Sequence, residues 1–251
     1  MKDKEKGIQL NKYISSTGFC SRREADRYIE EARVTVNEEI AFPGARVNAG
    51  DVVAVDGERI KASKKLPVYI AFNKPRGITS TTDLSDRSNI ISFINHPKRI
   101  FPIGRLDKDS EGLILLTNDG DIVNKILRAG NEHEKEYIVS VNKPITPEFV
   151  KRMASGLPIM GTKTKPCTVR QLGSRSFKIV LTQGLNRQIR RMCEHLDYEV
   201  VTLKRIRIMN ITLGNLAVGK WRNLSVTEAG ALQALLKDSV KTEEASVRRK
   251  R

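Results

Sequence analysis

From about residue 67 onward, strand-like and helix-like segments do not alternate in the regular order of a parallel α/β sheet. Apolar, β-branched runs predict strands at 68–73, 112–117, 136–141, 176–182 and within 200–213. Helical spacing of apolar residues predicts helices at 121–128, 147–155, 186–196 and 228–238. Several strands follow one another through short links. We therefore expect an α+β fold, built on a mixed, mostly antiparallel sheet with flanking helices.

The first 66 residues predict a separate, small unit of two helices and a hairpin. Gly18 is expected to end the first helix, and Ser21 and Glu24 have the spacing of a capping box that starts the second at Arg22. The polar, basic stretch KASKKLP at 61–67 is typical of a linker. We expect four segments: a flexible N-terminus (1–6), a small domain (7–66), a larger domain (67–235) and a basic, disordered tail (236–251).

The charge of the chain predicts a polyanionic partner. Its 251 residues include 45 Lys and Arg against 29 Asp and Glu, a formal net charge of +16. At this size such an excess most often means a nucleic-acid partner. Residues 1–66 carry a net +2, so the larger domain holds the remaining +14. A basic structural protein of the ribosome would show the same excess.

Other features of the sequence exclude several classes of protein. Cys20, Cys167 and Cys193 form no C-x-x-C pair, so neither a disulfide framework nor a zinc ribbon is indicated. The three histidines are scattered, and we expect no metal site. The chain opens without an apolar signal core, and no apolar run approaches the roughly 18 residues of a membrane span. We expect a cytoplasmic protein without a membrane partner.

Arginines gather at two predicted helix starts. They are Arg22 and Arg23 in the small domain, and Arg187, Arg190 and Arg191 after an expected Asn186 cap. Cations at a helix N-terminus oppose the helix dipole by about 0.3–1 kcal/mol each. Free backbone N–H groups together with arginines favour an anion, and phosphate is the obvious one. Pairing with acidic side chains elsewhere in the fold is the alternative.

One aspartate stands between basic residues in the segment FPIGRLDKDSEG. Gly104 allows an unusual backbone conformation there, and Arg105 and Lys108 flank Asp107. Cationic neighbours lower a carboxylate's pKa. A carboxylate on a phosphate-attracting surface repels the partner's backbone, which favours a role as nucleophile or base. A turn aspartate or a surface ion pair is the structural alternative. No P-loop motif is present, so a P-loop NTPase is excluded.

The small domain resembles the S-four-like RNA-binding domain over about residues 7–66. The matching residues are Leu10, Gly18, Ser21, Arg22, Ala25, Ile29, Val34, Val36, Asn37, Gly50, Asp51 and Val53. That family binds structured RNA through the face that carries the Ser-Arg pair, which implies RNA contacts for Arg22 and Arg23. Ala32 and Glu38 depart from the pattern because glycine is usual at both positions.

The larger domain resembles the bacterial ribosomal pseudouridine synthases of the small-subunit synthase A type. The matching motifs occur in the family's order: Asn73-Lys74-Pro75-x-Gly77, Gly104-Arg105-Leu106-Asp107, Lys135-x-Tyr137, Gly184-x-Asn186-Arg187-Gln188-Ile189-Arg190-Arg191-Met192 and Leu203-x-Arg205. An S-four-like domain in front is also that family's arrangement. The resemblance covers the chain to about residue 235. Within the family, the chain resembles a large-subunit synthase most.

The resemblance implies a catalytic site. Asp107 would be the essential carboxylate, attacking the sugar or removing a sugar proton, and Arg190 would pair with it. Tyr137 would stack on the uracil and help to remove the C5 proton, and Leu203 would pack on the other side of the base. The implied substrate-binding residues are Arg105, Leu106, Lys108, Arg187, Gln188, Ile189 and Leu203, with phosphate contacts from Arg105, Lys108 and Arg187.

The implied reaction is the isomerisation of a specific uridine in large-subunit (23S) ribosomal RNA, with a transfer-RNA uridine left open as a second target. An isomerisation needs no cofactor, and we expect no metal and a monomer. A non-catalytic RNA-binding or ribosome-assembly factor explains the charge and the small domain equally well. It does not explain Asp107 between its basic neighbours.

Overall fold

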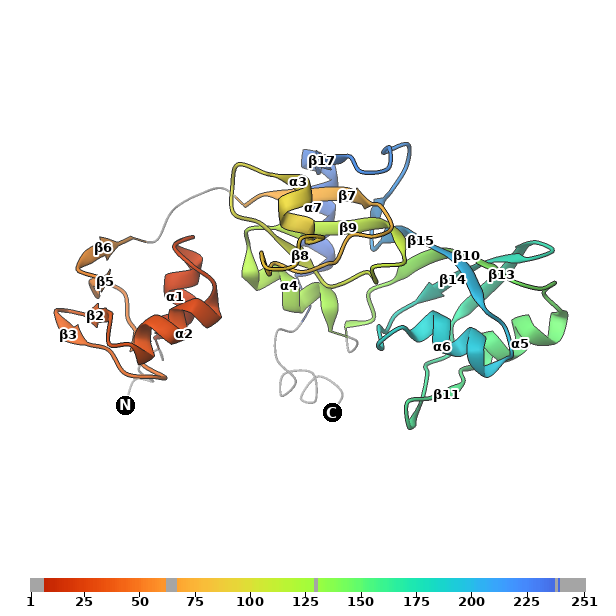
Figure 1. Cartoon of the computed structure of the whole chain (residues 1–251), viewed down its shortest axis with the longest axis horizontal. Coiled ribbons are helices and arrows are strands. Elements are labelled where there is room, and N and C mark those ends of the chain that lie inside the picture. The colour runs from red at the N-terminus through yellow and green to blue at the C-terminus, as the bar shows by residue number, and fades with distance from the viewer. Residues whose placement is uncertain (1–6, 62–66, 129–130, 238, 240–251) are drawn as a thin grey trace. The chain divides into compact units, whose positions relative to one another are not determined.

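The computed structural model describes residues 7–61, 67–128, 131–237 and 239. The chain divides into two compact units, Met1–Pro67 and Val68–Arg251 (Figure 1). The expected flexible segment at 1–6 and most of the expected tail at 236–251 lie outside the described residues. The start of that tail belongs to the larger unit, because the Leu236 side chain is buried in its core.

The first unit contains two short helices and small antiparallel sheets. The helices are α1 (Leu10–Ser16) and α2 (Arg22–Glu30). Strands β3 (Glu39–Ile40), β2 (Val34–Val36), β5 (Val53–Val55) and β6 (Glu58–Ile60) form one sheet in this order, and β1 (Ile8–Gln9) pairs with β4 (Arg46–Val47). The helices and the sheet enclose a core that includes Leu10, Ile14, Ile29 and Val53.

Helix α2 starts as expected. The Ser21 side chain accepts a hydrogen bond from the backbone N–H of Glu24 at 3.1 Å, and the Glu24 carboxylate accepts one from the N–H of Ser21 at 2.7 Å. The capping box therefore places Arg22 and Arg23 in the first turn. Ala32 and Glu38 adopt the left-handed region, with φ of 55° and 72°. Both positions thus require the conformation that glycine adopts without strain.

The second unit is built on a nine-stranded mixed sheet. Its main path runs β13 (Thr168–Gly173), β14 (Ser176–Leu181), β10 (Lys135–Val141), β15 (Val200–Ile208), β9 (Glu111–Thr117), β7 (Tyr69–Lys74) and β17 (Trp221–Asn223). Strand β16 (Ile211–Thr212) pairs with β15, and β8 (Phe101–Ile103) pairs with β9. Strands β15 and β9 are parallel, and the other pairs are antiparallel. The expected α+β class with a mostly antiparallel sheet is confirmed.

Helices lie on both sides of this sheet (Figure 1). They are α3 (Ile90–Ile94), α4 (Gly120–Leu127), α5 (Pro147–Ser155), α6 (Gln188–His195) and α7 (Val226–Leu235), and a small hairpin joins β11 (Pro158–Ile159) to β12 (Thr162–Lys163). The sequence predicted four of the helices but not α3, which is a single short turn. It also missed β8, β13 and β17, because β8 and β17 are only three residues long and β13 is largely exposed.

Strand β9 is buried on both faces, which explains its continuous apolar run. Leu113 and Leu115 pack in one core with α4 and α7, while Ile114 and Leu116 pack in another with α3. A third core lies between α5, α6 and strands β10 and β14. Different helices therefore cover the sheet along its width. Their packing holds the central strands β9, β15 and β10 in place.

The parallel contact between β9 and β15 depends on Gly112. Its φ is +104°, and a Cβ atom there would collide with the backbone oxygen of Arg205. Gly112 is the cross-strand neighbour of Arg205. Because only glycine permits this close approach, the strand that follows the Asp107 turn can lie directly beside β15.

Candidate active site

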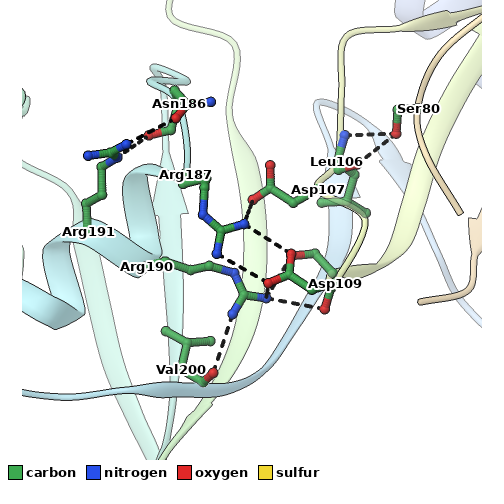
Figure 2. Close-up of polar contacts among 10 residues, drawn as sticks. Ser80, Leu106, Asp107, Asp109, Asn186, Arg187, Arg190, Arg191 and Val200 are labelled. Carbon is green, nitrogen blue, oxygen red and sulfur yellow. Dashed lines mark hydrogen bonds and ion pairs between the residues drawn. The ribbon is translucent and has the colours of Figure 1, made fainter. Parts of the chain in front are cut away.

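The turn that carries Asp107 connects β8 to β9 and is fixed by contacts from elsewhere. Gly104 has a φ of +76°, as the sequence led us to expect. The Ser80 hydroxyl donates to the Leu106 carbonyl at 2.8 Å and accepts from the Leu106 N–H at 3.2 Å (Figure 2). The backbone N–H of Ser110 donates to the Asp107 carbonyl at 3.0 Å. The Asp107 backbone therefore has little freedom to move.

Two arginines of the α6 region approach the two carboxylates of this turn (Figure 2). The Arg187 Nη1 atom lies 3.7 Å from the Asp107 carboxylate and 3.2 Å from the Asp109 carboxylate. The Arg190 Nη2 atom lies 3.3 Å from the Asp109 carboxylate and 3.1 Å from the Ser110 hydroxyl. The expected pairing of Arg190 with Asp107 is therefore wrong, because the turn presents Asp109 to Arg190.

Asp109 neutralises the buried Arg190. The Arg190 side chain is 9% exposed, whereas that of Asp109 is 41% exposed. Burial alone would raise the pKa of Asp109. The hydrogen bond from Arg187 and the charges of Arg190 and Arg187 outweigh burial and lower that pKa. The Asp109 carboxylate is thus held as an anion between two arginines, which leaves Asp107 with the looser contact.

The start of α6 differs from the expected one. Arg187 occupies the N-cap position in a left-handed conformation, with no side-chain cap, so Asn186 does not cap the helix. Asn186 instead accepts hydrogen bonds from Arg191, at 3.1 Å on its backbone oxygen and 3.4 Å on its side-chain oxygen. Figure 2 shows Arg191 on the side of Asn186 that faces away from the aspartates. Of the three arginines expected at this helix start, Arg187 and Arg190 line the pocket described next and Arg191 does not.

A pocket of about 390 Å³ opens beside Asp107, a volume suited to a small ligand. Its walls come from the Asp107 turn, α4, strands β10, β14 and β15, and the start of α6. It contains most of the residues that the sequence singled out: Arg105, Leu106, Asp107, Tyr137, Arg187, Gln188, Ile189, Arg190 and Leu203. Tyr137 and Leu203 are buried in its wall. The pocket thus brings together the Asp107 carboxylate, the Tyr137 ring and the apolar Leu203 side chain.

Two of the expected binding residues have structural partners. The buried Gln188 side-chain oxygen accepts from the Leu185 N–H at 3.0 Å, which holds the loop before α6. Ile189 is buried in the core between α6 and the sheet. Both line the pocket, but their contacts show that they also shape it.

A wider groove adjoins the pocket and includes the remaining predicted residue, Lys108. The groove has a volume of about 1150 Å³, and Arg76, Arg105 and Arg187 line it together with Lys108. Lys108 and Arg105 are exposed. Four carboxylates line the groove as well, those of Asp83, Asp86, Asp107 and Asp109. The groove runs past Asp107 to the pocket entrance, since Asp107, Arg105 and Arg187 line both spaces.

The site also includes residues to which the sequence analysis assigned no role. Ser80 fixes Leu106, and Asp109 holds Arg190. Lys135 and Arg205, which stood in the matching motifs without a function, line the pocket. Lys135 and Tyr137 are two residues apart on β10, and such spacing puts both side chains on one face of a strand. The motif Lys135-x-Tyr137 was therefore a usable signal, whereas Ser80 gave none.

The predicted RNA-contact arginines of the first unit are exposed on α2. Arg22 donates to the side-chain oxygens of Gln9 at 2.9 Å and Asn11 at 3.3 Å. Over the described parts of the chain, no cluster of three or more His, Cys, Asp or Glu side chains is placed to hold a metal ion. No helix among the described residues has the length and apolar character needed to span a membrane.

Comparison with known proteins shows the class of protein that this fold and site define. The family model described as RNA pseudouridylate synthase matches residues 68–195, and the S4 domain model matches residues 9–53. A structure described as a pseudouridylate synthase superposes with a TM-score of 0.66 at 27% identity, covering 90% of this chain and all of that one. The chain belongs to the RNA pseudouridylate synthase family. It is an RNA-modifying isomerase with an N-terminal S4 domain.

Individual relatives refine the comparison. The dual-specificity RNA pseudouridine synthase RluF of Escherichia coli (strain K12) is 56% identical over 236 residues, which cover 94% of this chain and 81% of that protein. The ribosomal large subunit pseudouridine synthase B of Bacillus subtilis (strain 168) is 34% identical, covering 90% of this chain and 96% of that protein. These names correct the expected grouping with the small-subunit synthase A type.

Proposed function

We propose that this synthase isomerises a specific uridine of large-subunit (23S) ribosomal RNA to pseudouridine in the cytoplasm, with a transfer-RNA uridine as a second target. The observation that carries the proposal is the placement of Asp107, which projects from a fixed turn at the mouth of a base-sized pocket and next to a groove with exposed cations. The names of the relatives support the choice of RNA, since one is dual-specific and another acts on the large subunit.

Asp107 is the essential carboxylate in this proposal. The bond between the sugar C1′ and the uracil N1 must break, and the base must turn and rejoin through C5. Asp107 either attacks C1′ or removes a sugar proton, and both routes need an ionised, accessible oxygen. The Asp107 side chain is 32% exposed and contacts Arg187 only at 3.7 Å. An oxygen of this carboxylate is therefore accessible to a ribose at the pocket mouth.

Tyr137 and Leu203 hold the uracil in this proposal. Both side chains are buried in the pocket wall, on the adjacent strands β10 and β15. In this proposal the phenol ring stacks on the base, and its hydroxyl helps to remove the C5 proton. The target uridine has to leave its stack to enter, which costs a few kcal/mol.

Arg190 acts as a positioning residue rather than as the partner of Asp107. Its guanidinium contacts the Asp109 carboxylate and backbone oxygen and the Ser110 hydroxyl, all on the turn that follows Asp107. It also donates to the Val200 carbonyl at 3.4 Å. Arg190 therefore ties α6 and β15 to the catalytic turn, and it supports Asp107 through the backbone.

Exposed cations of the groove bind RNA phosphates in this proposal. Arg105 and Lys108 line the groove, and their exposure leaves them available to a polyanion. Arg187 lines it too, with its guanidinium paired to Asp109 at 3.2 Å. Arg22 and Arg23 of the S4 domain provide a second contact with structured RNA. This division agrees with the charge distribution, because residues 1–66 have a net charge of only +2.

Mapping of pseudouridines in total RNA, with and without the gene, tests this function. We expect the loss of one pseudouridine in large-subunit ribosomal RNA, and a loss in transfer RNA if the second target is real. Restoring the gene with the Asp107→Asn substitution should leave the position unmodified, whereas the unaltered gene should restore it. An unchanged map in both RNA classes would contradict the proposal.

A further inference from the structure

Two buried cations line the pocket beside Tyr137. Lys135 and Tyr137 lie on the same face of β10, and Arg205 on β15 is the cross-strand neighbour of Tyr137. The Arg205 guanidinium carbon is 5.9 Å from the centre of the Tyr137 ring. All three side chains line the pocket that Asp107 borders. The wall that faces a bound uracil therefore carries two positive charges and a ring.

Neither cation has an acidic partner among the described residues. Lys135 is 8% exposed, and its ammonium group donates to the His133 carbonyl at a long 3.2 Å. Arg205 is 4% exposed. Its Nε donates to the Leu113 carbonyl at 2.6 Å and its Nη1 to the Arg105 carbonyl at 3.4 Å, but within the described parts of the chain the buried Nη2 has no hydrogen-bond partner.

Such an arrangement is unfavourable unless a ligand pairs with these groups. Burial lowers the pKa of Lys135 to about 8, and the charge of Arg205 adds to this effect. A buried charge without a partner and a buried donor without an acceptor both destabilise a fold. A ligand that brings hydrogen-bond acceptors and negative charge into this wall would remove both penalties.

We propose that Lys135 and Arg205 bind the carbonyl oxygens of the target uracil and stabilise the negative charge that the base carries while it is detached. This inference rests on the proposed function, because the ligand is the uridine that reacts at Asp107. Lys135 and Arg205 would then be catalytic residues in addition to Asp107 and Tyr137.

The charge follows from the electron balance of the reaction. When the C1′–N1 bond breaks, its electron pair leaves with N1. The sugar is left either bonded to the Asp107 carboxylate or, after losing a proton to that carboxylate, as an unsaturated sugar. In both routes the base carries one negative charge, spread over N1 and the carbonyl oxygens. The base loses this charge when C5 bonds to C1′, as the sugar either releases the Asp107 carboxylate or takes its proton back from it. C5 then loses its proton and N1 gains one, so the product is neutral. Cationic donors fixed at those oxygens stabilise this state more than the neutral uridine.

A backbone phosphate fits this wall less well than the base. The cations expected to bind phosphates, Arg105, Lys108 and Arg187, are exposed along the groove. Lys135 and Arg205 are buried, with apolar neighbours such as Leu203 and Ile208 in the same wall. A flipped, planar base can enter such a pocket, whereas a phosphate would have to give up most of its hydration.

Single-turnover kinetics of Lys135→Met, with saturating enzyme, test the proposal. The substrate is an unmodified transcript of large-subunit ribosomal RNA labelled with tritium at uridine C5. We expect the rate of tritium release to fall by about 100-fold or more, with RNA affinity nearly unchanged. Lys204→Met is the matched control, because it removes a charge from β15 on the opposite face from Arg205. The control should keep the wild-type rate.

Thermal unfolding separates a catalytic role from a structural one. Lys74 is also buried, with a pKa that burial lowers to about 8, but it donates to the carbonyls of Pro75 at 2.9 Å and Ile78 at 2.8 Å. Lys74→Met should lower the melting temperature because it leaves both carbonyls without a donor. Lys135→Met should keep or raise it, since it removes a poorly paired buried charge. A lower melting temperature for Lys135→Met would assign Lys135 a structural role and overturn the proposal.

A change of the base tests the charge directly. Transcripts made with 5-fluorouridine carry a base whose anion is more stable, so detachment depends less on the enzyme's cations. The rate is measured as the loss of the starting nucleoside, by digestion of the RNA and mass spectrometry. We expect Lys135→Met to lower this rate less on the 5-fluorouridine transcript than on the uridine transcript. An equal loss of rate on both RNAs would overturn the proposal. Weakened RNA binding with a wild-type rate at saturation would also overturn it, because that result would indicate a phosphate contact.

A wild-type chain that releases no tritium overturns the proposed function and this inference with it. An active wild-type chain with an equally active Lys135→Met overturns this inference alone.

Discussion

The buried Arg190 guanidinium pairs with the half-exposed Asp109 carboxylate at 3.3 Å, while Asp107 two residues earlier contacts Arg187 at 3.7 Å. Arg190 also reaches the Asp109 backbone oxygen and the Ser110 hydroxyl. The arginine thus fixes the turn that carries Asp107, and the carboxylate proposed to react has the longest of these ion-pair contacts.

Arg190→Lys should lower both turnover and stability. A lysine keeps the charge but cannot reach Asp109, Ser110 and Val200 at once, because it lacks the planar fork of arginine. We expect a loss of about 1–3 kcal/mol of unfolding free energy and a lower kcat with nearly unchanged RNA affinity. Chemical denaturation and single-turnover assays measure these effects. A wild-type kcat in Arg190→Lys would contradict the positioning role.

Asp109→Asn should make stability depend less on pH in the acid range. The pKa of Asp109 is lowered in the folded protein, so its contribution is fully present above the unfolded pKa of about 3.9 and is lost as the pH falls through the folded value. The half-exposed pair should contribute about 1 kcal/mol. Denaturation at several pH values should show a gap between wild type and variant at pH 6 that closes below about pH 4. A gap that persists or widens in acid would show that the charge of Asp109 does not matter.

Ser80→Ala should slow catalysis without weakening RNA binding. The substitution removes both hydrogen bonds to the Leu106 backbone, next to Asp107, and leaves two buried backbone groups unpaired. Such a loss costs about 1–3 kcal/mol and loosens the turn. Ser85→Ala is the control, since the one partner of its hydroxyl among the described residues is the exposed Asp83. Equal kcat in the two variants would remove Ser80 from the positioning residues.

Glycine at position 32 or 38 should stabilise the first unit. Ala32 and Glu38 adopt φ values of 55° and 72°, which cost a residue with a Cβ about 1–2 kcal/mol relative to glycine. Part of that gain is offset by the entropy of glycine in the unfolded chain, so we expect a net gain below about 1 kcal/mol for each change. Thermal unfolding of Ala32→Gly and Glu38→Gly measures it. A lower melting temperature in both variants would contradict the strain assigned to these turns.

The sequence predicted features that depend on local pattern. Ser21 and Glu24 are three residues apart, so their capping box could be seen directly, and the apolar runs located the central strands. It could not predict contacts that the fold alone creates. Ser80 lies 26 residues before Leu106, and nothing in its neighbourhood indicates their contact. Whether Arg190 meets Asp107 or Asp109 depends on the shape of one turn, and the resemblance implied the wrong partner.

Tritium release from RNA labelled at uridine C5 tests the central claim, that Asp107 carries out the isomerisation. Wild-type protein should release tritium from an unmodified large-subunit transcript. Asp107→Asn keeps the shape of the side chain but removes its charge, so it should release tritium at least about 10⁴-fold more slowly while binding the RNA as well as wild type. Tritium release at the wild-type rate by purified Asp107→Asn would contradict the account.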